Sequence, residues 1–183
     1  AAPLIEVGRP APIAVDSVGL FEAAQAGLPH GPVWDSSRRD TVERLIALLP
    51  RANGSMPARD LAKRLLSVTG RPPADPPAGE GAAEAPAKAR SWVGLRAATL
   101  LALGDSEAAA NLARLVPSRL EDDDLARVLL DATLGAYDNS GTCTLIRSRI
   151  DRLNDAYWQK AFIFCQALAN EHGRAQLGLT MLR

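Results

Sequence analysis

The sequence is poor in the residues that most often build catalytic and metal sites, and it has no excess of charge of either sign. It contains two cysteines (Cys143 and Cys165) and two histidines (His30 and His172) without the spacing of metal ligands, so neither a zinc site nor another cofactor is predicted. Lys and Arg number 21, and Asp and Glu also number 21. Because nucleic acids and anionic lipids select basic surfaces, a nucleic-acid partner is not predicted.

Long apolar runs and aromatic residues are also scarce. No stretch approaches the roughly 18 apolar residues that a membrane-spanning helix needs, so no transmembrane segment is predicted. Aromatic residues make up 4% of the 183 residues, whereas hydrophobic residues as a whole make up 47%. The apolar content therefore comes mainly from Ala and Leu, which favours α-helices and a packed core of about one domain.

Both ends of the sequence bear on its origin. It begins with Ala1-Ala2-Pro3 and no initiator Met, as a chain does after a secretory signal peptide has been cut behind a small residue, although a trimmed start would look the same. The last helical pattern reaches Arg183 without a polar cap or stop signal, which favours a longer envelope protein. The sequence thus predicts a periplasmic or otherwise exported protein, with the cytoplasm as the alternative.

Proline divides the N-terminal half of the chain. Residues 1–34 contain five prolines and predict an extended arm that is anchored by Phe21 and Trp34. Residues 35–70 predict a helical hairpin. Residues 71–89 again contain five prolines and lack large apolar side chains, so they predict a flexible linker.

Capping signals locate the two helices of this hairpin. Ser37, with Asp40 three residues later, is a variant of the capping box and predicts the start of a helix that runs to Pro50. The second helix is predicted to begin near Ser55 and to stop at Gly70.

Residues 90–183 contain six helical patterns that form three pairs at a constant spacing, which we name the repeat interval. Trp92, Leu125 and Trp158 are separated by this interval, and its length of about 33 residues is typical of two-helix repeat units. The same interval places an acidic residue at the turn into the second helix of each pair, where it can cap the helix or complement its dipole: Asp105, Asp138 and Glu171. The helices are predicted at 91–103, 106–116, 121–137, 140–153, 155–170 and 174–183.

This segment, residues 89–183, resembles a short, divergent array of tetratricopeptide-like hairpins. Trp92 and Leu95 match the opening of the first helix, and Ala108 matches the small residue at the helix crossing. The resemblance implies an all-α fold, a superhelix of helical hairpins that carries the extended N-terminal arm. The sequence departs from the family pattern where a small residue is usual in the first helix: Arg96, Leu129 and Phe162.

The two cysteines are predicted to meet across a helix pair. If the turn around residues 153–155 joins two antiparallel helices, Cys143 lies about ten residues before it and Cys165 about eleven after it. Equal rise per residue then places both at a similar height, so a disulfide can form in an oxidising compartment. Two buried free thiols in the core are the alternative.

An esterase-like tripeptide, Gly104-Asp105-Ser106, does not predict catalysis. The lipases and esterases that begin their nucleophile block in this way need a His three residues after an Asp, and neither histidine has that partner. A helix-ending glycine followed by a capping aspartate explains the tripeptide. The acidic run 121–124 is likewise interpreted as charge at a helix N-terminus.

The predicted function is that of a non-catalytic protein-interaction or scaffold module of the bacterial envelope. The stretch 158–168 is also similar to exported proteobacterial proteins. By the tetratricopeptide resemblance, Arg90, Asp123 and Gln159 face a groove that binds a protein or peptide partner. The alternatives are a helical support domain of a larger cell-wall enzyme or transport machine, and a helical lipid-binding protein.

Overall fold

The computed structural model describes residues 14–29, 33–49, 55–75, 91–117, 122–152 and 155–182. Within these residues the chain is all-helical, as predicted, and has no strand beyond two isolated bridges. None of the described helices is long and apolar enough to cross a bilayer. The elements are a 3₁₀ turn, η1 (Val15–Ser17), and eight α-helices: α1 (Arg39–Ala47), α2 (Met56–Ser67), α3 (Trp92–Ala102), α4 (Ser106–Arg114), α5 (Asp123–Gly135), α6 (Asn139–Arg147), α7 (Ala156–Leu168) and α8 (His172–Met181).

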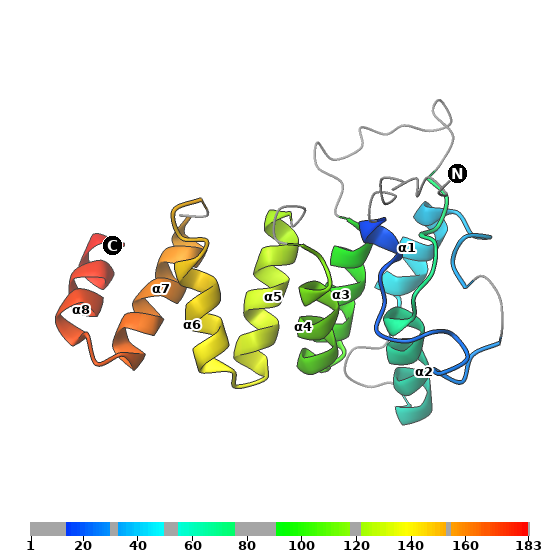
Figure 1. Ribbon diagram of the computed structural model, residues 1–183, viewed down its shortest axis with the longest axis horizontal. Helices are drawn as coiled ribbons and strands as arrows, with labels where there is room; N and C mark the ends of the chain where they lie inside the picture. The colour runs from blue at the N-terminus through cyan, green and yellow to red at the C-terminus, as the bar shows by residue number, and fades with distance from the viewer. Residues whose placement is uncertain are drawn as a thin grey trace, which may run out of the picture.

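The helices lie side by side in one elongated row, from α1 and α2 at one end to α8 at the other (Figure 1). From α3 onward each helix contacts the next one along the chain, and α3 also contacts α5. The six predicted C-terminal helices are all present. Their ends fall within two residues of the predicted ones, except that α6 ends at Arg147 instead of residue 153.

Aspartate side chains begin four of these helices. Asp105 and Asp138 cap α4 and α6, and they are one repeat interval apart. Asp122 and Asp155 cap α5 and α7 with the same spacing. Each carboxylate accepts a backbone N–H of the first helical turn, which would otherwise be unpaired. Glu171 stands at the equivalent N-cap of α8, but its side chain makes no capping hydrogen bond.

The other predicted caps had mixed outcomes. Ser55 accepts the backbone N–H of Ala58 at the start of α2, as predicted. The capping box at Ser37 was wrong, because Arg38 occupies the N-cap of α1 and its side chain does not cap the helix. Gly104 follows the end of α3 at φ +79°, a conformation that glycine adopts without strain.

Trp34 anchors the N-terminal segment to the larger of two hydrophobic cores, the first core, which includes Trp92 and the buried faces of α3 and α4. Its ring packs edge-on against Trp92 of α3, with 5.3 Å between the centroids, and only 9% of Trp34 is exposed. The prediction for Phe21 was wrong, because its side chain is 50% exposed. Phe21 is held instead through its backbone, whose carbonyl accepts the N–H of Thr69 at 2.8 Å.

A buried arginine joins the N-terminal segments to α3. The guanidinium of Arg96 is fully buried and donates hydrogen bonds of 2.7 Å to three backbone carbonyls, those of Val18, Leu66 and Val68. Burial lowers the pKa of Arg96 to about 10, while the nearby Asp16 carboxylate acts in the opposite direction. The side chain therefore remains charged at neutral pH and pairs carbonyls at the C-terminal end of α2 and just after η1.

A second, smaller core holds α5, α6 and α7 together. It centres on Trp158, which is fully buried against Ala126 and Leu130 of α5. Beside it, Cys143 of α6 and Cys165 of α7 lie with their sulfur atoms at bonding distance and their Cα atoms 5.6 Å apart. The predicted pairing is confirmed, so a disulfide crosses from the second predicted hairpin to the third.

Replacing Arg96 with Met is expected to destabilise the protein by about 3 kcal/mol or more. Met fills similar space but leaves two buried carbonyls and one partly buried carbonyl without a donor, and each buried unpaired group costs about 1–3 kcal/mol. Urea unfolding followed by circular dichroism measures the change. The control is Arg44→Met, whose side chain is 75% exposed and which should change stability by less than about 1 kcal/mol. Equal stability of the two variants would contradict the structural role of the Arg96 hydrogen bonds.

Candidate functional site

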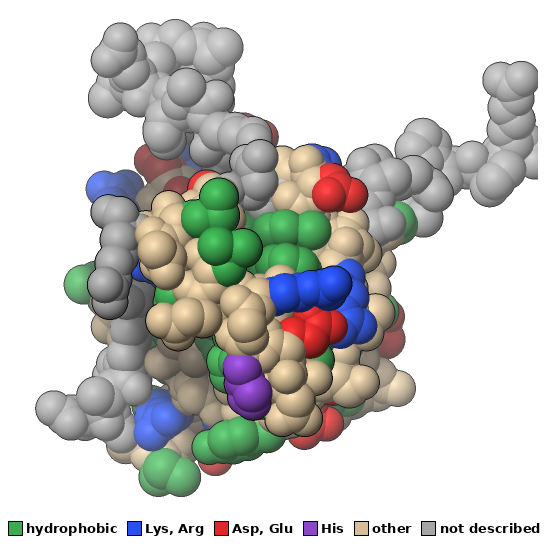
Figure 2. Space-filling model, turned by 90° about the vertical axis from the view of Figure 1, so that its left-hand side faces the viewer, with side chains coloured by type: hydrophobic (Ala, Val, Ile, Leu, Met, Phe, Trp, Pro, Cys, Tyr) green, Lys and Arg blue, Asp and Glu red, His purple; other side chains and the backbone are tan. Residues whose placement is uncertain are grey.

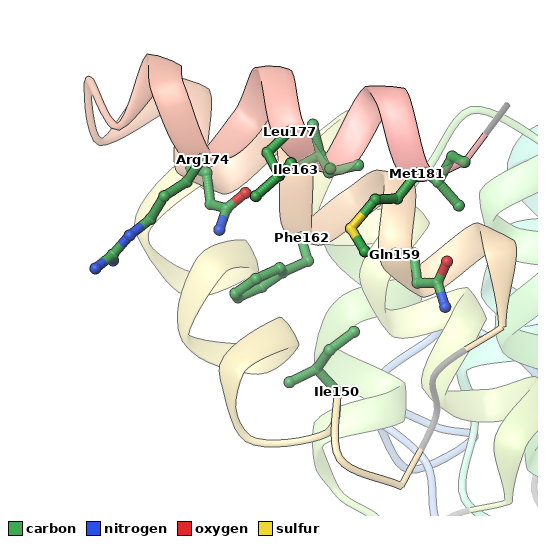
Figure 3. Close-up of a pocket in the computed structure, with 10 residues that line it drawn as sticks. Ile150, Gln159, Phe162, Ile163, Arg174, Leu177 and Met181 are labelled. Carbon is green, nitrogen blue, oxygen red and sulfur yellow. The ribbon is translucent and has the colours of Figure 1, made fainter.

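An apolar groove lies beneath the last helical pair, and we name it the terminal groove. It lies between α7, α8 and the turn that follows α6, and encloses a cavity of about 580 Å³ (Figure 3). Apolar side chains predominate in its lining, with glutamines and one arginine near its edges. The lining residues are Ile150, Gln159, Phe162, Ile163, Gln166, Arg174, Leu177, Gly178, Met181 and Leu182.

Helical spacing accounts for the shape of this groove. The α7 wall uses residues 159, 162, 163 and 166, and the α8 wall uses 174, 177, 178 and 181. Both sets follow the i, i+3, i+4, i+7 pattern of a single helix face. Gly178 permits the close approach of the two walls, because a Cβ there would lie 2.7 Å from Cγ1 of Ile163.

The α8 wall leaves large hydrophobic side chains in solvent. Met181 is 80% exposed and Leu177 is 62% exposed, whereas Ala175 is the one buried residue among those described in α8. Figure 2 shows this end of the molecule, where hydrophobic side chains gather next to a small patch of mixed charge. Exposed apolar surface beside a concave cavity is typical of a binding site for a protein segment or an apolar ligand.

The charged residue at the edge of the groove is turned away from its apolar interior. Arg174 points away from Phe162 and Leu177 in Figure 3 and donates to the carboxylate of Glu171 at 3.1 Å. Among the described residues there is no group of three or more His, Cys, Asp or Glu that could hold a metal ion. Shape and apolar contact are therefore the chief means by which this groove can recognise a ligand.

A polar cluster lies between α5 and α7. Asp155, the N-cap of α7, pairs with the guanidinium of Arg127, which also lies 4.9 Å from the centre of the Tyr157 ring. The Tyr157 hydroxyl donates to the Asp131 carboxylate at 2.5 Å. Burial raises the pKa of the Tyr157 phenol, and the hydrogen bond to Asp131 raises it further. The cluster fixes how α7 sits on α5.

The three predicted partner contacts lie apart. Arg90 lies outside the described residues. Asp123 begins α5 and accepts from Arg152 at 3.4 Å, and it does not line the terminal groove. Gln159 lies in α7 and lines the groove. These contact assignments stay predictions.

Sequence reasoning missed the α8 wall of the groove. Leu177 and Met181, four residues apart, could have been recognised as an apolar stripe, with Gly178 beside it as the sign of a close helix crossing. No protein-family model, curated protein or solved structure matches the chain.

Alkaline titration tests the polar cluster. In a Tyr137→Phe variant Tyr157 is the remaining tyrosine, and its tyrosinate absorbance is expected to appear well above pH 10, the ordinary pKa of the phenol. Asp131→Asn in this background should lower that pKa. Because the folded-state pKa is raised, the stabilisation is present below pH 10 and is lost as pH rises through the folded-state value. A titration curve of Tyr157 that is the same with and without Asp131 would contradict the hydrogen bond between the two side chains.

Proposed function

We propose that this protein is a non-catalytic protein-interaction or scaffold module of the bacterial envelope, built as a stack of tetratricopeptide-like hairpins. The observation that carries the proposal is the terminal groove, because it combines a cavity of about 580 Å³ with large exposed apolar side chains. Such surface is costly to leave in water and is typical of interaction sites. The groove is the partner site in this proposal, and Gln159 is the predicted contact that lines it.

A second groove supports the repeat interpretation. A cavity of about 370 Å³ lies between α5 and α6, and most of its lining residues recur one repeat interval later in the terminal groove. The two grooves differ in chemistry, because hydroxyl side chains in the first stand where the second has Leu or Met. The recurring pairs include Leu129 and Phe162, Thr133 and Gln166, Thr144 and Leu177, and Ser148 and Met181.

The cysteine pair supports export. Disulfides persist in the periplasm and outside the cell and are rare in reducing cytoplasm. Cys165 is 3% exposed and lies beside Trp158 in the second core, so the bond would add a covalent link where α6 and α7 already pack. The cysteine pair therefore supports the proposal that the protein is exported to an oxidising compartment.

Mass spectrometry of protein recovered from the periplasm tests the bond and the compartment. The intact mass is expected to be lower than that of the dithiol by two hydrogen atoms, and no cysteine should be alkylated until reduction. A peptide map should join residues 143 and 165. Two thiols that alkylate without reduction would contradict export and favour the cytoplasmic alternative.

Photo-cross-linking in the producing cell tests the groove. Replacing Leu177 with p-benzoylphenylalanine should give a discrete adduct with one protein after irradiation. The same replacement at Leu45, which is 60% exposed on α1 at the other end of the row, is the control. The partner is then purified, and Leu177→Arg should weaken its binding at least tenfold without changing the helical content. Equal adducts from both positions, or none from Leu177, would contradict the proposal.

The cavity also favours a second candidate function, the binding of a lipid-like ligand. Its volume lies within the range of about 300–1,000 Å³ that small-molecule sites occupy, and its walls are mainly apolar. Native mass spectrometry distinguishes the two functions, because a lipid carrier retains a ligand mass that Leu177→Arg removes. A helical support domain would instead show, as its cross-linked partner, an envelope enzyme or transport protein.

A further inference from the structure

Comparison of positions one repeat interval apart shows that one face of the last helical pair is exposed where its equivalents are buried. Ala113 of α4 is 1% exposed and Ile146 of α6 is 0% exposed, but Leu179 of α8 is 51% exposed. The first helices show the same change at Val93, Ala126 and Gln159: the first two are fully buried and the third is exposed. We name the exposed Gln159, Lys160 and Leu179, together with the largely buried Ile163 beside them (9% exposed), the end face.

An amphipathic helix covers the equivalent face twice within this chain. Helix α5 packs across α3 and α4, and α7 packs on α6. Trp158 of α7 also reaches α5 through the core that the two helices share. In the second case Trp158 of α7 lies against Ala126, Leu130 and Ile146. No described helix lies over the end face in this way, and Gln159 and Ile163 connect it to the terminal groove.

The charge of Lys160 is a second indication that a helix can pack on the end face. Arg127 of α5 binds Asp155, the aspartate that caps the covering helix α7. The residue one repeat interval after Arg127 is Lys160, which is exposed and has no ion-pair partner among the described residues. A basic residue thus stands where the N-cap carboxylate of a further covering helix would lie.

We propose that the end face docks an amphipathic α-helix of a partner protein, which packs on α7 and α8 as α7 packs on α5 and α6. This rests on the proposed function and names its partner chemistry. The helix has an acidic N-cap opposite Lys160 and a stripe of large apolar side chains against Leu179 and the exposed edge of Ile163. The packing of α7 within this chain is the template for how the partner helix would contact α7 and α8 and for where its N-terminus would lie.

The experiment uses the full chain and a labelled peptide of residues 122–137, which contains α5 with its capping Asp122. Fluorescence anisotropy is expected to show saturable binding with a Kd of about 10–100 µM. Leu179→Glu should weaken binding at least tenfold, and the matched control Leu45→Glu at the far end of the row should not. A peptide with Leu129→Pro, which breaks the helix, should not bind.

A double-mutant cycle tests the charge register. Lys160→Glu should weaken the binding of the unmodified peptide about threefold and weaken a peptide with Asp122→Asn less, because Asn keeps the cap without its charge while Asp123 and Asp124 remain. Equal effects on the two peptides would overturn the placement of the N-cap.

The outcomes separate this inference from the proposed function. If Leu177 cross-links a protein in the cell but the helical peptide does not bind, or binds as well after Leu179→Glu, the helical partner is wrong and the interaction function stands. A cross-linked product of twice the chain mass would replace the partner helix with a second copy. If the peptide binds as expected while Leu177 gives no adduct in the cell, the docking face stands and the proposed function fails.

Discussion

The buried charge of Arg96 is the constraint on which the N-terminal half of the molecule depends. A guanidinium without partners would be very costly in an apolar core, and the three carbonyls that receive it belong to segments far away in the sequence. All three carbonyls accept their hydrogen bonds from this one guanidinium. The segment around Val18, the end of α2 and helix α3 therefore depend on one another, since removing any of them leaves polar groups of the others unpaired.

From α3 onward the structure depends on two features that recur along the chain, aspartate N-caps and buried tryptophan rings. Aspartate caps recur at the repeat interval, and each fixes where a helix starts and at what height it meets its neighbour. Large rings stand at two of the three positions of the opening series, Trp92 in the first core and Trp158 in the second. Between them α5 contributes to both cores, so the two are packed on a shared helix rather than joined by a loop.

Features that depend on neighbouring residues could be predicted from the sequence, and features that depend on distant ones could not. The caps at Asp105 and Asp138 and the height of the two cysteines follow from local geometry and helical rise. Arg96 was predicted only as a departure from a repeat pattern, because its carbonyl partners lie about 30 and 78 residues away. The groove wall at Leu177 was missed because an apolar stripe has the same spacing whether it is buried or exposed.

The position of the disulfide has a mechanical consequence. It ties α7 to α6, whereas α8 is held to α7 by packing contacts such as that of Gly178 with Ile163. A pull applied to α7 is therefore carried into the middle of the row through a covalent bond. A pull applied to α8 is resisted by side-chain packing, so α8 can separate from α7 while the disulfide still holds α6 and α7 together.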